Sequence, residues 1–351
     1  MKISIDFNTY LELEKISDGS FFPLKGFMEA DDYFSVCEKM RLKNGNLFPL
    51  PVVLGTNEKE AKNIKINSEL RLYYNNAKVG SILVKSVFKP NLLKYKSYLF
   101  GTNDINHPGY KVLNGMGTFF IGGPIISFFQ IEHRYSKITK SPKECREQIK
   151  TLQLSSVAGF QTRNVPHRAH EYILLSALEE VEGLFIQPLI GKKKRGDFLP
   201  EAIIKSYQYL IENVFKNKNI ILGALTTYMR YAGPREAVFH ALIRKNFGCS
   251  HFLVGRDHAG VADYYGLYEA QELCLKYEEE LNIKIIKVRG PFFCKKCNKI
   301  TNDKFCNHED SRIEVSGTKI RKALLKNLVI KDIFMRNEIV KLIRKEDIFI
   351  N

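Results

Sequence analysis

The sequence predicts an α/β protein in which a doubly wound parallel sheet follows a β-rich domain and precedes a small helical C-terminal region. Three observations support this prediction. Up to about residue 150, short apolar stretches are cut by Gly, Asn and Pro, without long helical periodicity. Strand-like and helix-like runs then alternate, which is typical of βαβ units with helices on both faces of a sheet. A basic tail with helical periodicity closes the chain. We expect domains at 1–152, 153–312 and 313–351.

Three apolar stretches define the strands of the first domain: LFPLPVVLG (47–55), ELRLYYNNAKVGSILVKSVF (69–88) and GTFFIGGPIISFF (117–129). Asn75 and Asn76 separate two alternating runs, and Asn tolerates a positive φ, so we expect a hairpin turn there. One of a few short helices is expected near residues 31–40.

The second domain should contain five strands and four helices. We expect strands at 157–160, 184–190, 219–225, 251–255 and 283–288, and helices at 167–181, 200–216, 234–247 and 265–281. Pro234 and Gly248 bound the third helix, because Pro favours the first helical position and Gly the position after the last turn. In the third region, Ser316 or Thr318 is the expected N-cap of a helix.

The formal net charge of +16 fits either an anionic partner or a lysine-rich surface. Most lysines are dispersed, and the longest basic run is Lys192–Arg195. We therefore assign most of the charge to the surface and reserve an anionic ligand for clustered arginines. The most apolar window, residues 118–129, is too short for a membrane span, and no secretory signal opens the chain. A cytoplasmic protein without a membrane partner is expected.

Polar clusters follow four of the predicted strands. They are QTRNVPHRAH (161–170), GKKKRGD (191–197), YMRYAGPREA (228–237) and GRDHAG (255–260). Ligands of doubly wound sheets bind beyond the carboxyl ends of the strands. A shared binding cleft accounts for these clusters, whereas core packing does not require them.

His167 and His170 are three residues apart at the expected start of a helix, where free N–H groups favour anions. The alternative is an N-cap histidine beside a packed one. Arg163, Asn164 and Arg168 surround the pair, which favours a phosphate site. Metal ligation is disfavoured because no HExxH-type glutamate accompanies the histidines.

With these motifs the chain resembles the ATP sulfurylase (sulfate adenylyltransferase) family. Members carry a QTRNPxHRAH-type motif, here 161–170, together with MRYAGPREA (229–237), GRDHAG (255–260) and SGTxIR (316–321). PLKGFM (23–28), LFPLPVVL (47–54) and GTNDINHPG (101–109) extend the resemblance over nearly the whole chain. It implies a PUA-like N-terminal domain, a Rossmann-like nucleotidyltransferase domain and a small helical C-terminal region.

The resemblance implies that ATP and sulfate are converted to adenosine 5′-phosphosulfate and pyrophosphate, by in-line attack of sulfate on the α-phosphate. Sulfate would be held by Gln161, Arg163 and the backbone N–H of Ala259. The reacting phosphoryl group would be surrounded by Thr162, Arg163 and Asn164. ATP would be bound by Gln161, Asn164, His167, His170, Gly255, Arg256, Asp257 and His258, and the expected catalytic set is Thr162, Arg163, Asn164, His167 and His170. Mg²⁺ is expected on ATP, held largely by phosphates and water.

Two features qualify the resemblance. The family usually has Pro directly after the motif's Asn, whereas here Val165 intervenes before Pro166, so the path of the backbone before His167 is an open question. The chain also lacks a GxxxxGK[ST] motif, so a fused kinase domain is not expected.

Residues 294–308 read CKKCNKITNDKFCNH, a spacing that predicts structural Zn²⁺ bound by Cys294, Cys297, Cys306 and His308. Glu309 or Asp310 is the alternative fourth ligand, because Cys306 and His308 are close in sequence. A redox or incidental CxxC is the competing interpretation.

Two other functions remain compatible with the sequence. One is a zinc-containing nucleic-acid-binding protein with a PUA-like domain, although the basic tail has few interleaved aromatics and no nucleic acid is expected. The other is an HxxH nucleotidyltransferase with a different acceptor. A homodimer is usual in related proteins and is expected here, while the sequence leaves the physiological direction of the reaction open.

Overall fold

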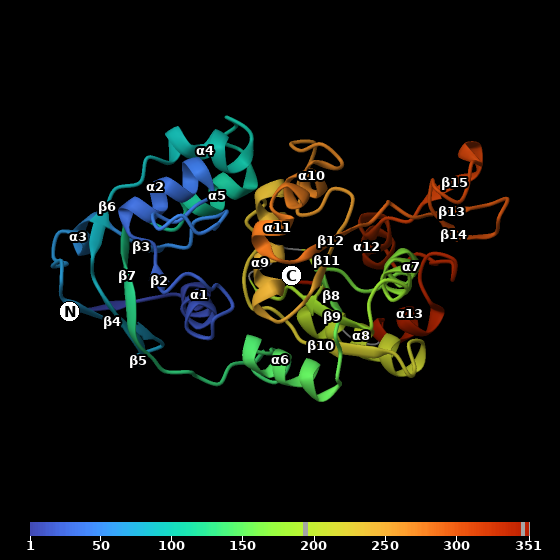
Figure 1. Ribbon diagram of the computed structural model, residues 1–351, viewed down its shortest axis with the longest axis horizontal. Coiled ribbons are helices and arrows are strands. Elements are labelled where there is room, and N and C mark those ends of the chain that lie inside the picture. Colours follow the sequence, from blue (N-terminus) through green and yellow to red (C-terminus); the bar gives the residue numbers. More distant parts are fainter. Residues whose placement is uncertain (192–195, 345–347, 351) are drawn as a thin grey trace.

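The computed structural model describes residues 1–191, 196–344 and 348–350. It has two lobes side by side (Figure 1): a β-rich N-terminal lobe, drawn in blue and teal, and an α/β lobe. A small three-stranded sheet projects from the far end of the α/β lobe. Of the predicted features, most of the 191–197 cluster, with its basic run, and the end of the basic tail lie outside the described residues.

The N-terminal lobe is built on a seven-stranded mixed sheet in the order β1-β4-β5-β7-β2, with β3 and β6 also paired to β7. Its strands are β1 (Lys2–Ser4), β2 (Gly26–Phe27), β3 (Leu54–Thr56), β4 (Glu69–Tyr74), β5 (Ala77–Leu83), β6 (Ser86–Phe88) and β7 (Phe119–Phe128). Asn75 and Asn76 have φ of 47° and 64°, which confirms the predicted hairpin, because a two-residue type I′ turn needs positive φ at both positions.

Short helices cover this sheet: α1 (Phe7–Ser17), α2 (Ala30–Lys39), α3 (Glu58–Ala61), α4 (Leu92–Phe100) and α5 (Pro108–Asn114). The expected helix near 31–40 is α2. The α1 helix, which sequence periodicity did not single out, is buried at seven consecutive positions, Tyr10 to Ile16. It therefore lies between other elements rather than on the surface.

The α/β lobe contains the predicted five-stranded parallel sheet, in the order β10-β9-β8-β11-β12. The strands are β8 (Val157–Thr162), β9 (Gly183–Pro188), β10 (Asn219–Leu222), β11 (His251–Val254) and β12 (Lys284–Lys287). The order reverses between β8 and β11, which is the position where doubly wound sheets open a crevice for ligands.

The helices of this lobe are α6 (Pro142–Thr151), α7 (Arg168–Ala177), α8 (Pro200–Asn213), α9 (Gly233–Asn246), α10 (Glu269–Lys276) and α11 (Glu278–Leu281). The predicted helix at 265–281 is two helices, since Tyr277 leaves the helical region with φ −107° and ψ 8°. The helix expected to reach Val181 ends at Ala177, where i→i+3 bonds tighten the last turn. Gly248, whose φ is 94°, follows the end of α9 as predicted, whereas Pro234 is the second residue of α9 rather than the first.

The small antiparallel sheet contains β13 (Phe292–Cys294), β14 (Lys299–Thr301) and β15 (Arg312–Glu314), with a 3₁₀ turn at Glu309–Ser311. Two helices follow, α12 (Gly317–Leu325) and α13 (Asn337–Ile343). Ser316 is the N-cap residue of α12, but its side chain makes no capping hydrogen bond. Within the described ranges, none of the helices is both long and apolar enough to cross a membrane.

Candidate active site

The QTRNVPHRAH segment runs from the end of β8 into α7. Thr162 Oγ accepts a hydrogen bond from the N–H of Asn164 at 3.2 Å, which turns the chain immediately after the strand. Val165 is buried in the core, so it fixes the loop by packing where the family usually has Pro. His167 is the N-cap of α7, with extended φ and ψ of −136° and 172°.

The two predicted histidines stack, with ring centroids 3.8 Å apart and an interplanar angle of 14°. Burial lowers the pKa of His167 well below its usual value and lowers that of His170 to about 4. Both imidazoles are therefore neutral at neutral pH. His167 Nδ1 accepts from the N–H of His170 at 3.4 Å, which leaves its proton on Nε2. That nitrogen faces Gly317 at the start of α12, where an added methyl would lie 3.7 Å from it.

Arg163 carries a buried guanidinium nitrogen, Nη1, that has no hydrogen-bond partner among the described residues. Burial raises the pKa of Tyr231, and the nearby Arg163 guanidinium opposes part of that rise. Burial likewise raises the pKa of Asp257, and Arg163 and Arg256 oppose it. A buried donor without a partner costs ~1–3 kcal/mol, so an anion at this position would satisfy a group that the fold leaves unpaired.

GRDHAG follows β11 and forms the opposite wall. Asp257 and Ala259 have positive φ of 54° and 57°, and a methyl added at Gly260 would come within 1.7 Å of Asp257 Oδ1. The exposed Arg256 pairs with Glu314 at 2.8 Å.

The side chain of His258 is engaged inside the protein, where its Nε2 lies 3.1 Å from Nδ1 of His240. Burial lowers its pKa to about 3. Its ring also meets that of Phe252 edge-on. Any contact of this side chain with a nucleotide therefore competes with an internal hydrogen bond.

The residues predicted to bind sulfate, phosphates and nucleotide all line one cleft of ≈ 320 Å³. They are Gln161, Thr162, Arg163, Asn164, His167, His170, Gly255, Arg256, Asp257, His258 and Ala259. Asp257 is the sole carboxylate among the described residues that line it. The motifs at 161–170 and 255–260 thus converge at the reversal point of the sheet.

The expectation that all four strand exits share this cleft was only partly right. From YMRYAGPREA, Met229 lines the cleft, whereas Arg230 and Arg235 are buried elsewhere. Arg230 pairs with Glu12 of the N-terminal lobe, and Arg235 donates to the carbonyls of Val36 and Cys37. Both guanidinium groups thus have partners inside the protein, so neither is available to a ligand in the cleft.

Sequence reasoning missed three buried groups that do not line the cleft but contact motif residues beside it: Glu12 and Glu236, which bond to Arg230, and His240, which bonds to His258. Glu236 accepts the backbone N–H groups of Arg230 and Ala232 at 2.8 and 3.1 Å. Glu236 is part of the quoted MRYAGPREA motif, whereas α1 mixes polar and apolar residues, so no local signal marked Glu12 as buried.

The predicted metal ligands also converge. The ligand atoms of Cys294, Cys297, Cys306 and His308 lie within 4.8 Å of one another. Cys297 Sγ is 3.7 Å from Cys306 Sγ and 3.4 Å from His308 Nδ1. The cluster could hold a metal ion, and His308 rather than Glu309 or Asp310 supplies the fourth donor atom.

Comparisons with known proteins agree on the family. The ATP-sulfurylase family model matches residues 136–346, and a PUA-like domain model matches residues 1–130. A sulfate adenylyltransferase of Ignicoccus hospitalis is 38% identical over 353 residues, covering 100% of this chain and 92% of that protein. One from Pyrococcus abyssi is 38% identical, covering 99% and 90%, and one from Synechocystis is 40% identical, covering 97% and 88%.

Among solved structures, the hexameric APS kinase from Thiobacillus denitrificans superposes with a TM-score of 0.77 at 17% identity. The match covers 99% of this chain and 63% of that one. At this identity the match establishes a shared fold, in agreement with a β-rich lobe followed by a parallel-sheet lobe.

Proposed function

The chain belongs to the ATP-sulfurylase family and catalyses the sulfate adenylyltransferase reaction, and we propose that the cleft beyond β8 and β11 is where ATP and sulfate meet. The observation that carries this assignment is the buried, unpaired Nη1 of Arg163, surrounded by the polar lining of the cleft. One guanidinium at this position can address both anions, because its N–H donors form a fixed fork.

In the proposed step, a sulfate oxygen forms a bond to the α-phosphorus of ATP. The bond from that phosphorus to the bridging oxygen breaks, and its electron pair leaves with pyrophosphate. Sulfate has no proton to lose at neutral pH, so the cleft contributes positioning and charge stabilisation rather than a general base. Gln161, Arg163 and the Ala259 backbone N–H hold sulfate in this scheme.

Thr162, Arg163 and Asn164 surround the reacting phosphoryl group, and His167 and His170 bind the phosphates as neutral donors. The lowered pKa of both histidines supports this role, since a neutral imidazole with its proton on Nε2 can still donate to a phosphate oxygen. Gly255, Arg256, Asp257 and His258 bind the nucleotide in this scheme, and the His258 side chain also bonds to His240.

We propose that Mg²⁺ accompanies ATP and neutralises charge on its phosphates. With one carboxylate, Asp257, among the described lining residues, the cleft suits a cation held mainly by phosphates and water rather than by a protein cage.

The decisive test is pyrophosphate release from ATP. Sulfate should support it, and molybdate, which mimics sulfate but yields an unstable product, should give AMP and pyrophosphate continuously. Inorganic phosphate is the control acceptor. Release with phosphate but not with sulfate or molybdate would identify a different acceptor, and no release with any of them would refute the assignment.

We further propose that the Cys₃His cluster binds structural Zn²⁺. A tetrahedral site with Zn–S bonds of ~2.3 Å places its sulfur atoms about 3.8 Å apart, close to the 3.7 Å between Cys297 and Cys306. Four protein donors leave no open position, which is typical of structural sites. The four ligands lie in the segment that forms the small sheet of β13, β14 and β15. This segment connects Pro291 to Val315, two residues that line the cleft.

Metal analysis of the purified protein should find one zinc per chain, and Cys306→Ser should lower both the metal content and the melting temperature. A fully folded, metal-free protein would contradict the proposal.

We also propose that the protein is cytoplasmic, which suits an ATP-dependent enzyme, and that it forms a homodimer, as is usual for the family. We propose domains at 1–152, 153–312 and 313–351. Light scattering would test the assembly.

A further inference from the structure

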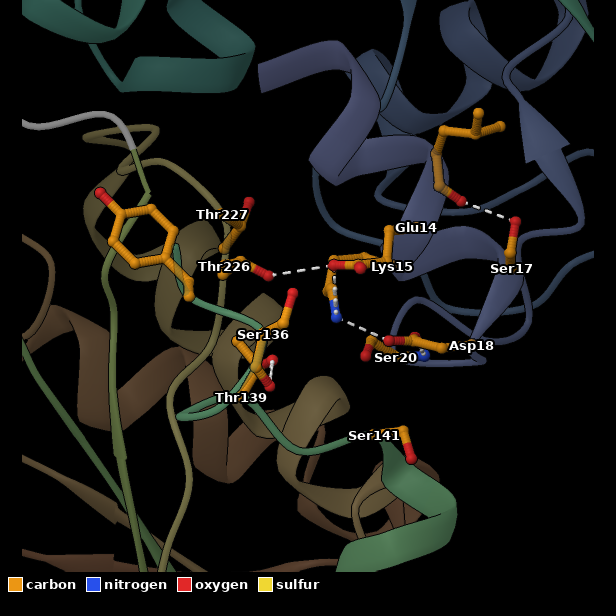
Figure 2. Close-up of polar contacts among 12 residues, drawn as sticks. Glu14, Lys15, Ser17, Asp18, Ser20, Ser136, Thr139, Ser141, Thr226 and Thr227 are labelled. Atoms are coloured by element: carbon orange, nitrogen blue, oxygen red, sulfur yellow. Dashed lines mark hydrogen bonds and ion pairs between the residues drawn. The ribbon is translucent and has the colours of Figure 1, made fainter. Parts of the chain in front are cut away.

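The two lobes meet through a row of buried polar groups, here called the seam: Glu12, Glu14 and Lys15 of α1, and Thr226, Thr227 and Arg230 of the α/β lobe. Glu14, Lys15, Thr226 and Thr227 are shown in Figure 2. Thr227 donates to Glu12 Oε1 at 2.6 Å, and Thr226 donates to Glu14 Oε2 at 3.3 Å. Two consecutive threonines of the α/β lobe thus bind two carboxylates of α1.

Glu12, Thr227 and Arg230 form a closed triangle. Glu12 Oε2 accepts from Arg230 Nη2, and Arg230 Nη1 donates to Thr227 Oγ1 at 3.2 Å. The guanidinium also lies over the rings of Tyr228 and Phe239, 4.4 and 4.7 Å from their centroids. Arg230, although part of a motif beside the cleft, is therefore fixed to the N-terminal lobe.

The backbone on either side of Arg230 has little room to shift. A methyl added at Gly191 would lie 1.9 Å from the Thr227 carbonyl oxygen, and one added at Gly109 would lie 2.3 Å from that of Arg230. The hydroxyl of Tyr265 donates to the Tyr231 carbonyl at 2.9 Å. Residues 227–231 are therefore held from several sides.

These contacts matter for the cleft because Met229, which lies between Thr227 and Arg230, lines the cleft together with Arg163. Met229 also borders a second, larger cavity of ≈ 600 Å³, which reaches Glu12. That cavity leaves the Met229 side chain without packing on one side, so its position depends on the backbone of residues 227–231.

We propose that Glu12 and Thr227 are positioning residues for the adenylyl transfer: the triangle with Arg230 fixes the backbone that carries Met229 and thereby holds Met229 against the cleft that Arg163 also lines. The N-terminal lobe thereby completes a site on the other lobe. This inference rests on the proposed role of Arg163 in sulfate binding.

The seam provides a matched pair of variants, Thr227→Val and Thr226→Val. Each removes one hydroxyl that is buried and bonded to an α1 carboxylate, so both should lower the melting temperature to a similar extent. Only Thr227→Val should raise the KM for sulfate, by about tenfold, below the ~100-fold that a 1 Å misplacement can cost. The KM for ATP should stay within about twofold, and Thr227→Ser, which keeps the hydroxyl, should restore the sulfate KM.

A second readout needs no turnover: the rise in melting temperature caused by added sulfate. It should be smaller in Thr227→Val and unchanged in Thr226→Val and Thr227→Ser. Equal behaviour of the two valine variants in both readouts, or a wild-type protein that sulfate does not stabilise, would overturn the positioning role. Absence of pyrophosphate release by the wild type would instead refute the proposed function, and the sulfate shifts would still decide the positioning role.

Discussion

The seam and the cleft both bury charged side chains, but they differ in whether those side chains have partners. In the seam, Arg230 meets Glu12, and Lys15 meets Asp18 at 2.6 Å and Glu14 at 3.3 Å. In the cleft, Nη1 of Arg163 is buried without a partner among the described residues. Paired buried charges hold elements together, whereas an unpaired one is a cost to folding that an anionic ligand can offset.

The protonation states of the buried groups also differ between the seam and the cleft. Burial alone would lower the pKa of Arg230, but the combined attraction of Glu12, Tyr228 and Glu236 outweighs it and raises the pKa, so the guanidinium stays charged. Burial lowers the pKa of His167 and His170 with no carboxylate to oppose it, so both stay neutral. The cleft therefore keeps neutral donors for phosphates beside two cationic groups, Arg163 and Arg256, of which Arg256 pairs with Glu314.

The largest effect is expected from Glu12→Ala, which leaves the Arg230 guanidinium buried without its carboxylate. Removing one partner of a buried pair costs about 3–5 kcal/mol, and urea unfolding should show a loss of this size. Replacing Glu12 and Arg230 together by Leu should recover part of it. A loss below about 1 kcal/mol for the single variant would show that the seam pair does not stabilise the interface.

Arg163→Ala should lower turnover without lowering stability, in contrast to Glu12→Ala in the seam. Turnover should fall by at least about 10²–10³-fold, the size of effect seen when one charge-stabilising donor is removed, while stability stays the same or rises because an unpaired donor is lost. The matched control is Arg168→Ala in the same motif, since Arg168 pairs with Asp332 and should affect stability rather than turnover. Retained turnover in Arg163→Ala would remove its assigned role.

Gly191→Ala tests whether the seam reaches the cleft through the backbone. The new methyl would lie 1.9 Å from the Thr227 carbonyl oxygen, so residues 227–231 must shift, and kcat/KM should fall by up to ~100-fold. Gly115→Ala is the control, as its nearest contact would be 3.2 Å. Equal kinetics in the two variants would argue against coupling between seam and cleft.

The smallest effect is expected from pH. A histidine with a depressed pKa in the folded state binds fewer protons than its unfolded form, whose pKa is ~6.5. For His170, with a folded pKa of about 4, stability should therefore fall as pH drops from about 6.5 towards 4. His170→Gln, which keeps a neutral donor, should show a weaker dependence between pH 7 and 4.5. A kinetic pKa near 6.5 that disappears in this variant would contradict a neutral His170.

Much of the fold followed from local patterns. The alternation after residue 150 predicted the five parallel strands, and Asn75–Asn76 predicted a hairpin, because both signals depend on neighbouring residues. Helix ends were less accurate: Tyr277 divides one predicted helix, a local backbone change that periodicity does not reveal. The buried α1 was not singled out, since a helix enclosed on several sides lacks a clear polar face.

The sequence by itself determined which chemical groups are available: two histidines at a helix start, the GRDHAG turn, and four ligands at metal-binding spacing. The tertiary structure alone decided which of them are free. Arg163, Arg230 and Arg235 all follow strands of one sheet, yet Arg230 pairs with a glutamate 218 residues away and Arg235 donates hydrogen bonds to carbonyls of α2. Burial and pairing depend on contacts between distant segments, so only the folded chain shows that Arg163 is left for a ligand.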